Sequence, residues 1–152
     1  DALPEEVLRN RVIEALLEYL KERNQEDCAD YFALRLLDLP TGEIESMLNL
    51  TARQRDYLQQ RFKYHLIRFA LSHHWELVHE WLEADLDRNL GLPPKQWQQL
   101  QDSLSQKQEK LLHLKQQRVD DAEIAQILGL TATQFHKQWS KLLGQAWELR
   151  NL

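Results

Sequence analysis

Apolar residues recur at three- and four-residue spacing along almost the whole chain, and this helical periodicity limits the fold more than any other feature. No segment alternates apolar and polar residues with a period of two, as a half-buried strand would. Only four glycines and four prolines occur in 152 residues, 43% of which are hydrophobic, so a helical chain of this kind can bury a core. We therefore predict an all-α protein.

Helix-start and helix-stop residues divide the chain into a series of predicted helices. Pro4 suits a first helical turn, and Gly91 followed by Pro93 and Pro94 ends one helix and starts the next. The predicted helices span 4–23, 26–38, 41–49, 52–90 with a break near Ser72, 95–104, 105–118, 121–128 and 132–149.

An internal repeat becomes visible when the chain is shifted by 80 residues without gaps. The string ALRLLDLPTGEIESMLNLTARQ, which ends at Gln54, then falls on HLKQQRVDDAEIAQILGLTATQ, which ends at Gln134. The two strings share eight identities in 22 positions, and these cluster around a turn, where helical periodicity alone predicts nothing. We expect two copies of one structural unit.

The second copy has the residue pattern of a helix-turn-helix. Asp120 and Glu123 are spaced as a capping box that starts a short helix, and Gly129 suits a left-handed residue at its end. Thr131 and Gln134 form a second predicted capping box, which starts the longer helix. The apolar positions predicted to face inward are Ile124, Leu128, Leu130, Phe135, Trp139 and Leu142.

The stretch EKLLHLKQQRVDDAEIAQILGLTATQFHKQWSKLL resembles region 4, the C-terminal promoter-reading region, of sigma-70-family factors. It is similar also to the tetrahelical domains of LuxR-type regulators. The resemblance covers about 45 residues, from Leu104 to Leu149, and implies a recognition helix at 132–143 that enters the major groove of double-stranded DNA. By position it implies that Thr133, Gln134, Lys137, Gln138 and Lys141 contact DNA, and His136 lies on the same polar face.

The first copy, 26–69, resembles the same region more loosely. Glu45 replaces the small Ala125, so either the helices splay or the carboxylate turns aside. The apolar face of its long helix is rotated by about one residue and consists of Leu58, Phe62, Leu66 and Phe69. This helix is nevertheless the most basic stretch of the chain, and we expect its exposed side to grip phosphates or simply to be solvated. The candidate phosphate contacts are Arg53, Arg61 and Lys63.

The predicted domain organisation is thus an N-terminal acidic helix (1–25), a degenerate sigma-region-4-like helix-turn-helix unit (26–69), a helical connector (70–103) and a sigma-region-4-like DNA-binding unit (104–152). Neither a sigma core-binding nor a promoter-melting region is recognised. We therefore expect either a regulator built from sigma-like modules or a part of a longer chain.

Charge and composition exclude several classes of function. The net charge of −5 is not that of a bulk nucleic-acid binder, although residues 51–68 hold five basic residues against Asp56 alone. The single cysteine, Cys28, cannot form an internal disulfide, and no apolar run could span a membrane. No local catalytic motif, phosphate loop or metal motif occurs; His79 and Glu83 share a helix face, but the metal-binding spacing of two histidines is missing. We expect a cytoplasmic protein that is not an enzyme and takes no metal or cofactor.

The most favoured function is sequence-specific DNA binding in bacterial transcription control, through the helix at 132–143. A homodimer or the tandem units would raise the apparent affinity through effective concentration. One alternative is an interaction module that docks on RNA polymerase or another regulator without touching DNA. Another is a plain three-helix bundle with a coincidental turn.

Overall fold

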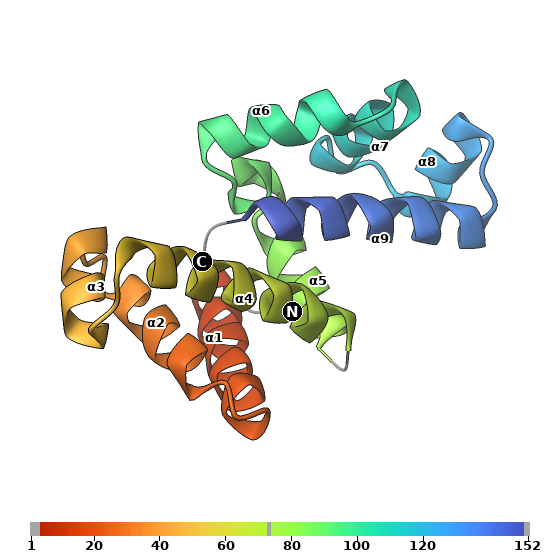
Figure 1. Cartoon of the computed structure of the whole chain (residues 1–152). Coiled ribbons are helices and arrows are strands. Elements are labelled where there is room, and N and C mark those ends of the chain that lie inside the picture. The colour runs from red at the N-terminus through yellow and green to blue at the C-terminus, as the bar shows by residue number, and fades with distance from the viewer. Residues whose placement is uncertain (1–3, 73, 151–152) are drawn as a thin grey trace. The chain divides into compact units, whose positions relative to one another are not determined.

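The computed structural model describes residues 4–72 and 74–150, and every regular element in these ranges is a helix (Figure 1). The prediction of an all-α protein is confirmed. The helices are α1 (Glu5–Glu22), α2 (Glu26–Leu36), α3 (Thr41–Leu48), α4 (Ala52–Leu71), α5 (Trp75–Ala84), the 3-10 helix η1 (Leu86–Gly91), α6 (Pro94–Ser103), α7 (Gln106–Gln116), α8 (Asp121–Leu128) and α9 (Ala132–Leu149).

The chain forms two compact units, which we describe separately. The N-terminal unit comprises residues 6–78, and the C-terminal unit comprises residues 79–150 together with residues 4–5. The division falls between Val78 and His79, inside the segment that the sequence assigns to a connector. The C-terminal unit therefore includes the last part of α5, η1 and α6 in addition to α7, α8 and α9.

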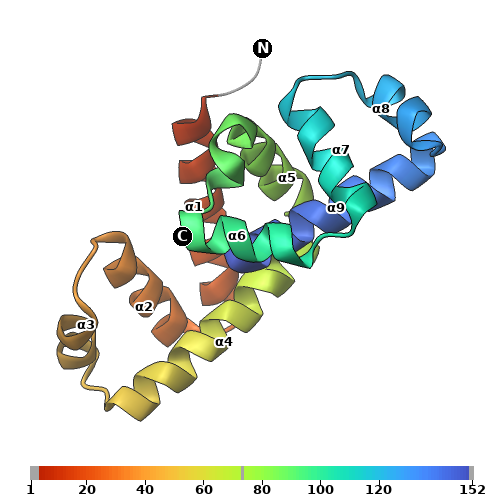
Figure 2. The same ribbon diagram turned by 90° about the horizontal axis from the view of Figure 1, so that it is seen from above.

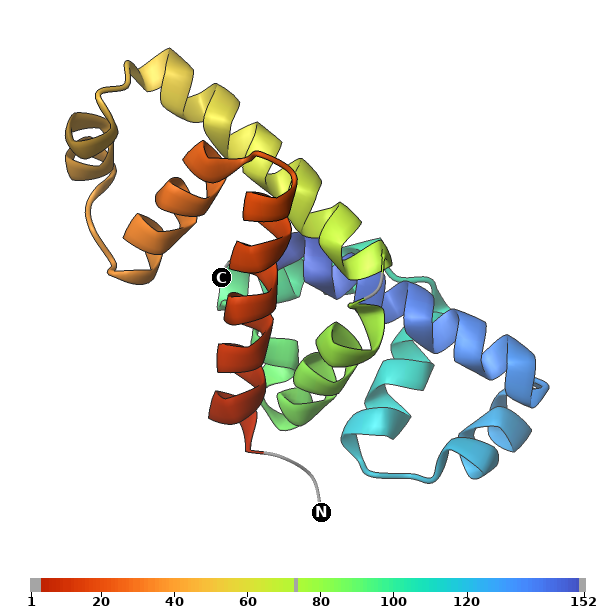
Figure 3. The same cartoon turned by 90° about the horizontal axis from the view of Figure 1, so that it is seen from below.

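The 80-residue repeat is also present in the backbone structure. The helices α2, α3 and α4 start 80 residues before α7, α8 and α9, and Figure 3 shows the same succession of helix, short helix and long helix in each unit. The turns match as well. Asp38 and Arg118 have positive φ angles of 56° and 63°, and Asn49 and Gly129, which end α3 and α8, have φ of 56° and 67°.

Aromatic packing holds the N-terminal unit together. The Phe32 ring stacks on Phe62 with centroids 5.1 Å apart, and the Tyr19 ring meets the edge of Phe69 at 5.5 Å. These contacts fix α4 against α1 and α2. The rotated apolar face predicted for the long helix is confirmed, because all four of its residues are buried: Leu58, Phe62, Leu66 and Phe69.

The helix predicted from 52 to 90 is in fact three elements. The break near Ser72 is confirmed, since α4 ends at Leu71. The continuation to Leu90 is wrong, because α5 ends at Ala84 and the chain turns into η1, where Leu90 has a φ of 58°. Leu90 is fully buried in this conformation, and the Gln116 side-chain amide donates a hydrogen bond to the Leu86 carbonyl at 3.1 Å. Burial and this tertiary contact override the helical pattern.

A buried side-chain cluster fixes the C-terminal end of α9, the long helix drawn in blue in Figure 2, within the C-terminal unit. The Trp81 and Trp147 rings meet edge to face with centroids 6.1 Å apart, and the Arg150 guanidinium lies 3.8 Å from the centre of the Trp81 ring. Arg150 Nη2 also donates to Asp85 Oδ2 at 2.6 Å. The long helix α9 is therefore held at its C-terminal end, while its N-terminal half belongs to the helix-turn-helix pattern.

Candidate nucleic-acid interface

The turn between α8 and α9 forms as the sequence predicts. Gly129 adopts a left-handed conformation with φ 67° and ψ 35°, and the Leu130 N–H donates to the Ala125 carbonyl at 2.8 Å. The Thr131–Gln134 capping box is complete: the Gln134 N–H donates to Thr131 Oγ1 at 3.1 Å, and the Thr131 N–H donates to Gln134 Oε1 at 2.9 Å. These contacts set the direction in which α9 leaves the turn.

The other predicted capping box does not form. Asp120 occupies the position before α8, but its side chain accepts no capping hydrogen bond. The exposed Asp120 carboxylate faces water, and the neighbouring Asp121 carboxylate accepts a hydrogen bond from Lys115 Nζ at 3.0 Å. An acidic first turn, favoured by the helix dipole, starts α8 in place of the box.

The inward face of α9 is buried as predicted. Phe135, Trp139 and Leu142 are exposed by only 7%, 2% and 0%. On α8, Ile124 is fully buried, whereas Leu128 and the turn residue Leu130 are half-buried. The opposite side of α9 is consequently turned outward within the C-terminal unit.

Glu83 anchors α9 through its tryptophan. The Trp139 Nε1–H donates to Glu83 Oε1 at 2.7 Å, and Lys115 Nζ lies 3.6 Å from the same oxygen and 4.9 Å from the centre of the Trp139 ring. His79 Nε2 lies 3.1 Å from Glu83 Oε1. Burial alone would raise the pKa of Glu83, but the hydrogen bonds from His79 and Trp139 and the charge of Lys115 lower that pKa to about 2. A carboxylate that is ionised at neutral pH therefore orients the helix.

The exposed face of α9 carries the residues that the resemblance singled out. Thr133, Lys137 and Lys141 follow one another at four-residue spacing and are all exposed. Gln134 and His136 are exposed beside this row, and Gln138 is half-buried. The carbonyl of the Gln134 amide is used in the capping box, which leaves its NH2 group to donate outward.

The basic residues of the N-terminal unit are not equivalent to one another. Arg53 and Lys63 are exposed, but the Arg61 guanidinium donates to Asp27 Oδ1 at 2.8 Å and to Gln25 Oε1 at 2.6 Å. Burial would raise the pKa of Asp27, yet the hydrogen bonds from Arg61 and the Cys28 N–H lower it. The charge of Arg61 is therefore already balanced within the unit.

The position of Glu45 in the first copy left open whether the helices splay or the carboxylate turns aside, and the carboxylate turns towards Arg55. This carboxylate is half-buried, and Glu45 Oε1 lies 3.2 Å from Arg55 Nε. In the C-terminal unit the same two positions hold Ala125 and Phe135, which are both buried. An ion pair thus stands where the other copy has two apolar residues.

Two further lysines belong to the candidate interface and were missed in the sequence. Lys107 and Lys110 are exposed on α7, at the positions that Asp27 and Asp30 occupy on α2. Since Asp27 and Arg61 touch in the first copy, Lys107 and Lys141 are the corresponding pair in the second. The signal was present: the 80-residue offset, extended one helix upstream, aligns two acidic residues with two lysines.

The two copies therefore differ in charge over one corresponding surface. Four positions of the C-terminal unit carry lysine, and none of the four forms an ion pair within residues 4–72 and 74–150. The corresponding positions of the N-terminal unit hold two aspartates, one tyrosine and one arginine. We call the first set the lysine surface; it consists of Lys107, Lys110, Lys137 and Lys141.

In the part of the chain that the structure describes, no group of three or more His, Cys, Asp or Glu side chains could hold a metal ion. No described helix is both long enough and apolar enough to cross a membrane.

Comparison with known protein families gives a match over almost the whole chain. The model of a family described as heterocyst differentiation protein HetZ-like matches residues 1–151. No curated protein and no solved structure matches the chain.

Proposed function

The chain belongs to the HetZ-like family, and from this premise we propose that it is a regulator of heterocyst differentiation that binds double-stranded DNA. In this proposal the C-terminal unit is a sigma-region-4-like helix-turn-helix, and α9 is the recognition helix. Thr133, Gln134 and Gln138 read base edges, and His136 lies at the border of the contact. The regulator acts in the cytoplasm, where the DNA is, without a catalytic role or a cofactor.

One observation carries the proposal: the lysine surface is exposed and has no acidic partner in the described ranges. Lysines that lack an intramolecular partner release counterions when phosphates bind, and this term supplies most of non-specific DNA affinity. Lys137 and Lys141 stand in the exposed row of α9, so their phosphate contacts would position the neighbouring residues that read bases. Lys63 is the candidate for an additional phosphate contact from the N-terminal unit, and Arg61 is left out because Asp27 balances it.

Salt dependence tests this proposal. Four phosphate contacts predict a loss of affinity for a random-sequence duplex of roughly 10²-fold between about 50 mM and about 200 mM salt. The Lys137→Ala plus Lys141→Ala variant should reduce the slope of log affinity against log salt by about two. The matched control is Lys21→Ala plus Lys95→Ala, which removes two exposed lysines outside the surface and should leave the slope unchanged.

The rival function is a protein-interaction module that docks on RNA polymerase or another regulator without DNA contact. The net charge of −5 favours it, because the chain as a whole repels a polyanion. A module of this kind would retard no duplex even at low salt. Such a result, obtained with folded protein, would replace the DNA-binding proposal by the rival.

A further inference from the structure

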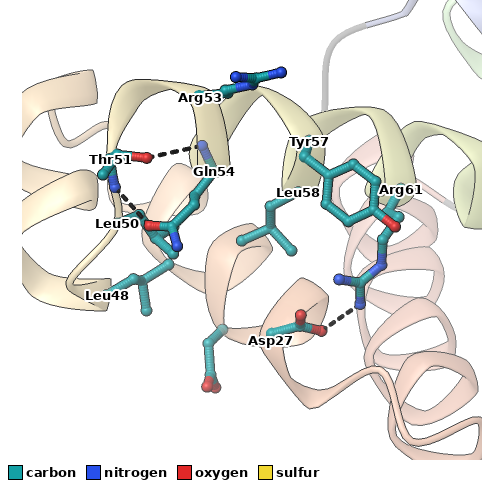
Figure 4. A pocket seen from close by; sticks show the side chains of 10 residues that line it. Asp27, Leu48, Leu50, Thr51, Arg53, Gln54, Tyr57, Leu58 and Arg61 are labelled. Carbon is teal, nitrogen blue, oxygen red and sulfur yellow. Dashed lines mark hydrogen bonds and ion pairs between the residues drawn. The ribbon is translucent and has the colours of Figure 1, made fainter.

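The N-terminal unit has an open groove on the side that corresponds to the DNA-reading face of the other unit. The groove has a volume of about 650 Å³ and lies among α2, the turn after α3 and the first half of α4. Its apolar residues are Leu48, Leu50 and Leu58, and Figure 4 shows these three leucines between α2 and α4. Tyr57, a residue that is 62% exposed, also lines it.

The charges around this groove have both signs. On one side, Asp27 and Arg61 neutralise each other at 2.8 Å, as the dashed line in Figure 4 shows. Asp30 on α2 and Arg53 on α4 are exposed and form no ion pair with any described residue. The groove therefore presents one unpaired anion and one unpaired cation on two different helices, separated by leucines.

This pattern distinguishes between classes of ligand. A nucleic-acid backbone supplies negative charge only, so it satisfies Arg53 and is repelled by the unpaired Asp30. A small ligand would bury little of its surface in this groove, because the groove is open rather than enclosed. A peptide can supply an acidic side chain, an apolar side chain and a basic side chain within a few residues. Tyrosine and arginine at the edge of an apolar pocket are also the residues enriched at protein-binding hot spots.

The corresponding surface of the C-terminal unit supports this distinction. Three lysines, Lys107, Lys110 and Lys137, stand where the groove has Asp27, Asp30 and Tyr57. The two copies of one backbone thus carry side chains suited to different partners.

We propose that the groove of the N-terminal unit binds a peptide segment of a partner protein. The segment places an apolar side chain on Leu48, Leu50 and Leu58, an acidic side chain beside Arg53 and a basic side chain beside Asp30. Tyr57 covers one flank of the apolar side chain. This inference does not rest on DNA binding by α9.

The test is a selection of random peptides displayed on phage against the full chain, followed by affinity measurements on the enriched peptides. We expect an apolar residue flanked by one acidic and one basic residue. Binding should fall at least about tenfold in Arg53→Glu and in Tyr57→Ala. The matched controls are Arg9→Glu and Tyr64→Ala, which make the same changes at exposed positions outside the groove and should leave the affinity unchanged.

A charge reversal makes the test sharper. Asp30→Lys should select peptides that carry a second acidic residue in place of the basic one, because the groove then offers two cations. The Lys137→Ala plus Lys141→Ala variant should bind the same peptides as the unchanged protein, which separates this inference from the DNA-binding proposal. The inference is overturned if no enriched peptide depends on Arg53 and Tyr57. It is also overturned if the Arg53→Glu substitution abolishes binding of a single-stranded oligonucleotide and weakens the binding of no peptide.

Discussion

At the scale of single residues, Glu83 is the side chain whose ionisation supports α9. Its pKa is lowered to about 2 from an ordinary value of 4.5, so its contribution to stability is complete above about pH 4.5 and is lost as the pH falls towards 2. We expect Glu83→Gln to lower the free energy of unfolding by roughly 1–2 kcal/mol at neutral pH, a value discounted because the side chain is 36% exposed.

Urea unfolding at about pH 7 and about pH 3 checks this expectation. The difference between the unchanged protein and Glu83→Gln should shrink at the lower pH, since Glu83 binds a proton in the unfolded chain, where its pKa is ordinary, and resists one in the folded protein. Glu80→Gln, at an exposed position of the same helix, serves as control and should show no such convergence. A Glu83→Gln penalty that is equal at both pH values would contradict the assignment.

Two left-handed glycines allow a second comparison of single residues. A Cβ at Gly91, where φ is 74°, would lie 2.6 Å from the Arg150 guanidinium, which Asp85 and Trp81 hold in place. A Cβ at Gly129, where φ is 67°, would meet nothing within 4 Å. Gly129→Ala should therefore cost only the left-handed backbone, about 1–2 kcal/mol. Gly91→Ala should cost clearly more. Thermal unfolding of the two variants, measured side by side, would show equal losses of stability if the Arg150 cluster were loose.

At the scale of elements, the capping boxes that start α4 and α9 are a matched pair. The Thr51–Gln54 and Thr131–Gln134 boxes have the same hydrogen-bond lengths, 3.1 Å and 2.9 Å. Thr51→Ala and Thr131→Ala should each lower the free energy of unfolding by about 1 kcal/mol. Only Thr131→Ala should also weaken DNA binding, because it frays the first turn of α9 beside Thr133. Equal DNA affinity of the two variants would mean that α9 does not contact DNA through its first turn.

The same pair of elements shows what can be predicted from sequence. The bounds of α8 and α9, the left-handed Gly129 and the Thr131 box depend on residues within a few positions of each other, so local rules predict them. The Asp27–Arg61 pair joins residues 34 positions apart, and the Trp139–Glu83 hydrogen bond joins residues 56 apart. Such contacts depend on how the helices pack, which periodicity does not specify. For this reason Arg61 was expected among the phosphate contacts, and Lys107 and Lys110 were missed.

At the scale of the whole molecule, DNA binding has to come from a local field, since the net charge is −5 and the sequence pI is about 5.7. Distant acidic residues are screened beyond about 10 Å at moderate salt, so the lysine surface acts largely alone there. At low salt the screening weakens and the acidic remainder of the chain opposes binding. The measured salt slope therefore reports the lysines most directly at moderate salt.

This reasoning leads to a prediction for α7. Lys107→Ala plus Lys110→Ala should lower the salt slope by about two and weaken binding to every duplex by a similar factor, because phosphate contacts carry no sequence information. Thr133→Ala plus Gln138→Ala should leave the slope unchanged and relax the sequence preference found by selection from random duplexes. If the α7 variant altered the selected sequence and left the slope intact, Lys107 and Lys110 would contact bases instead of phosphates. Helix α7 would then belong to the surface that reads bases.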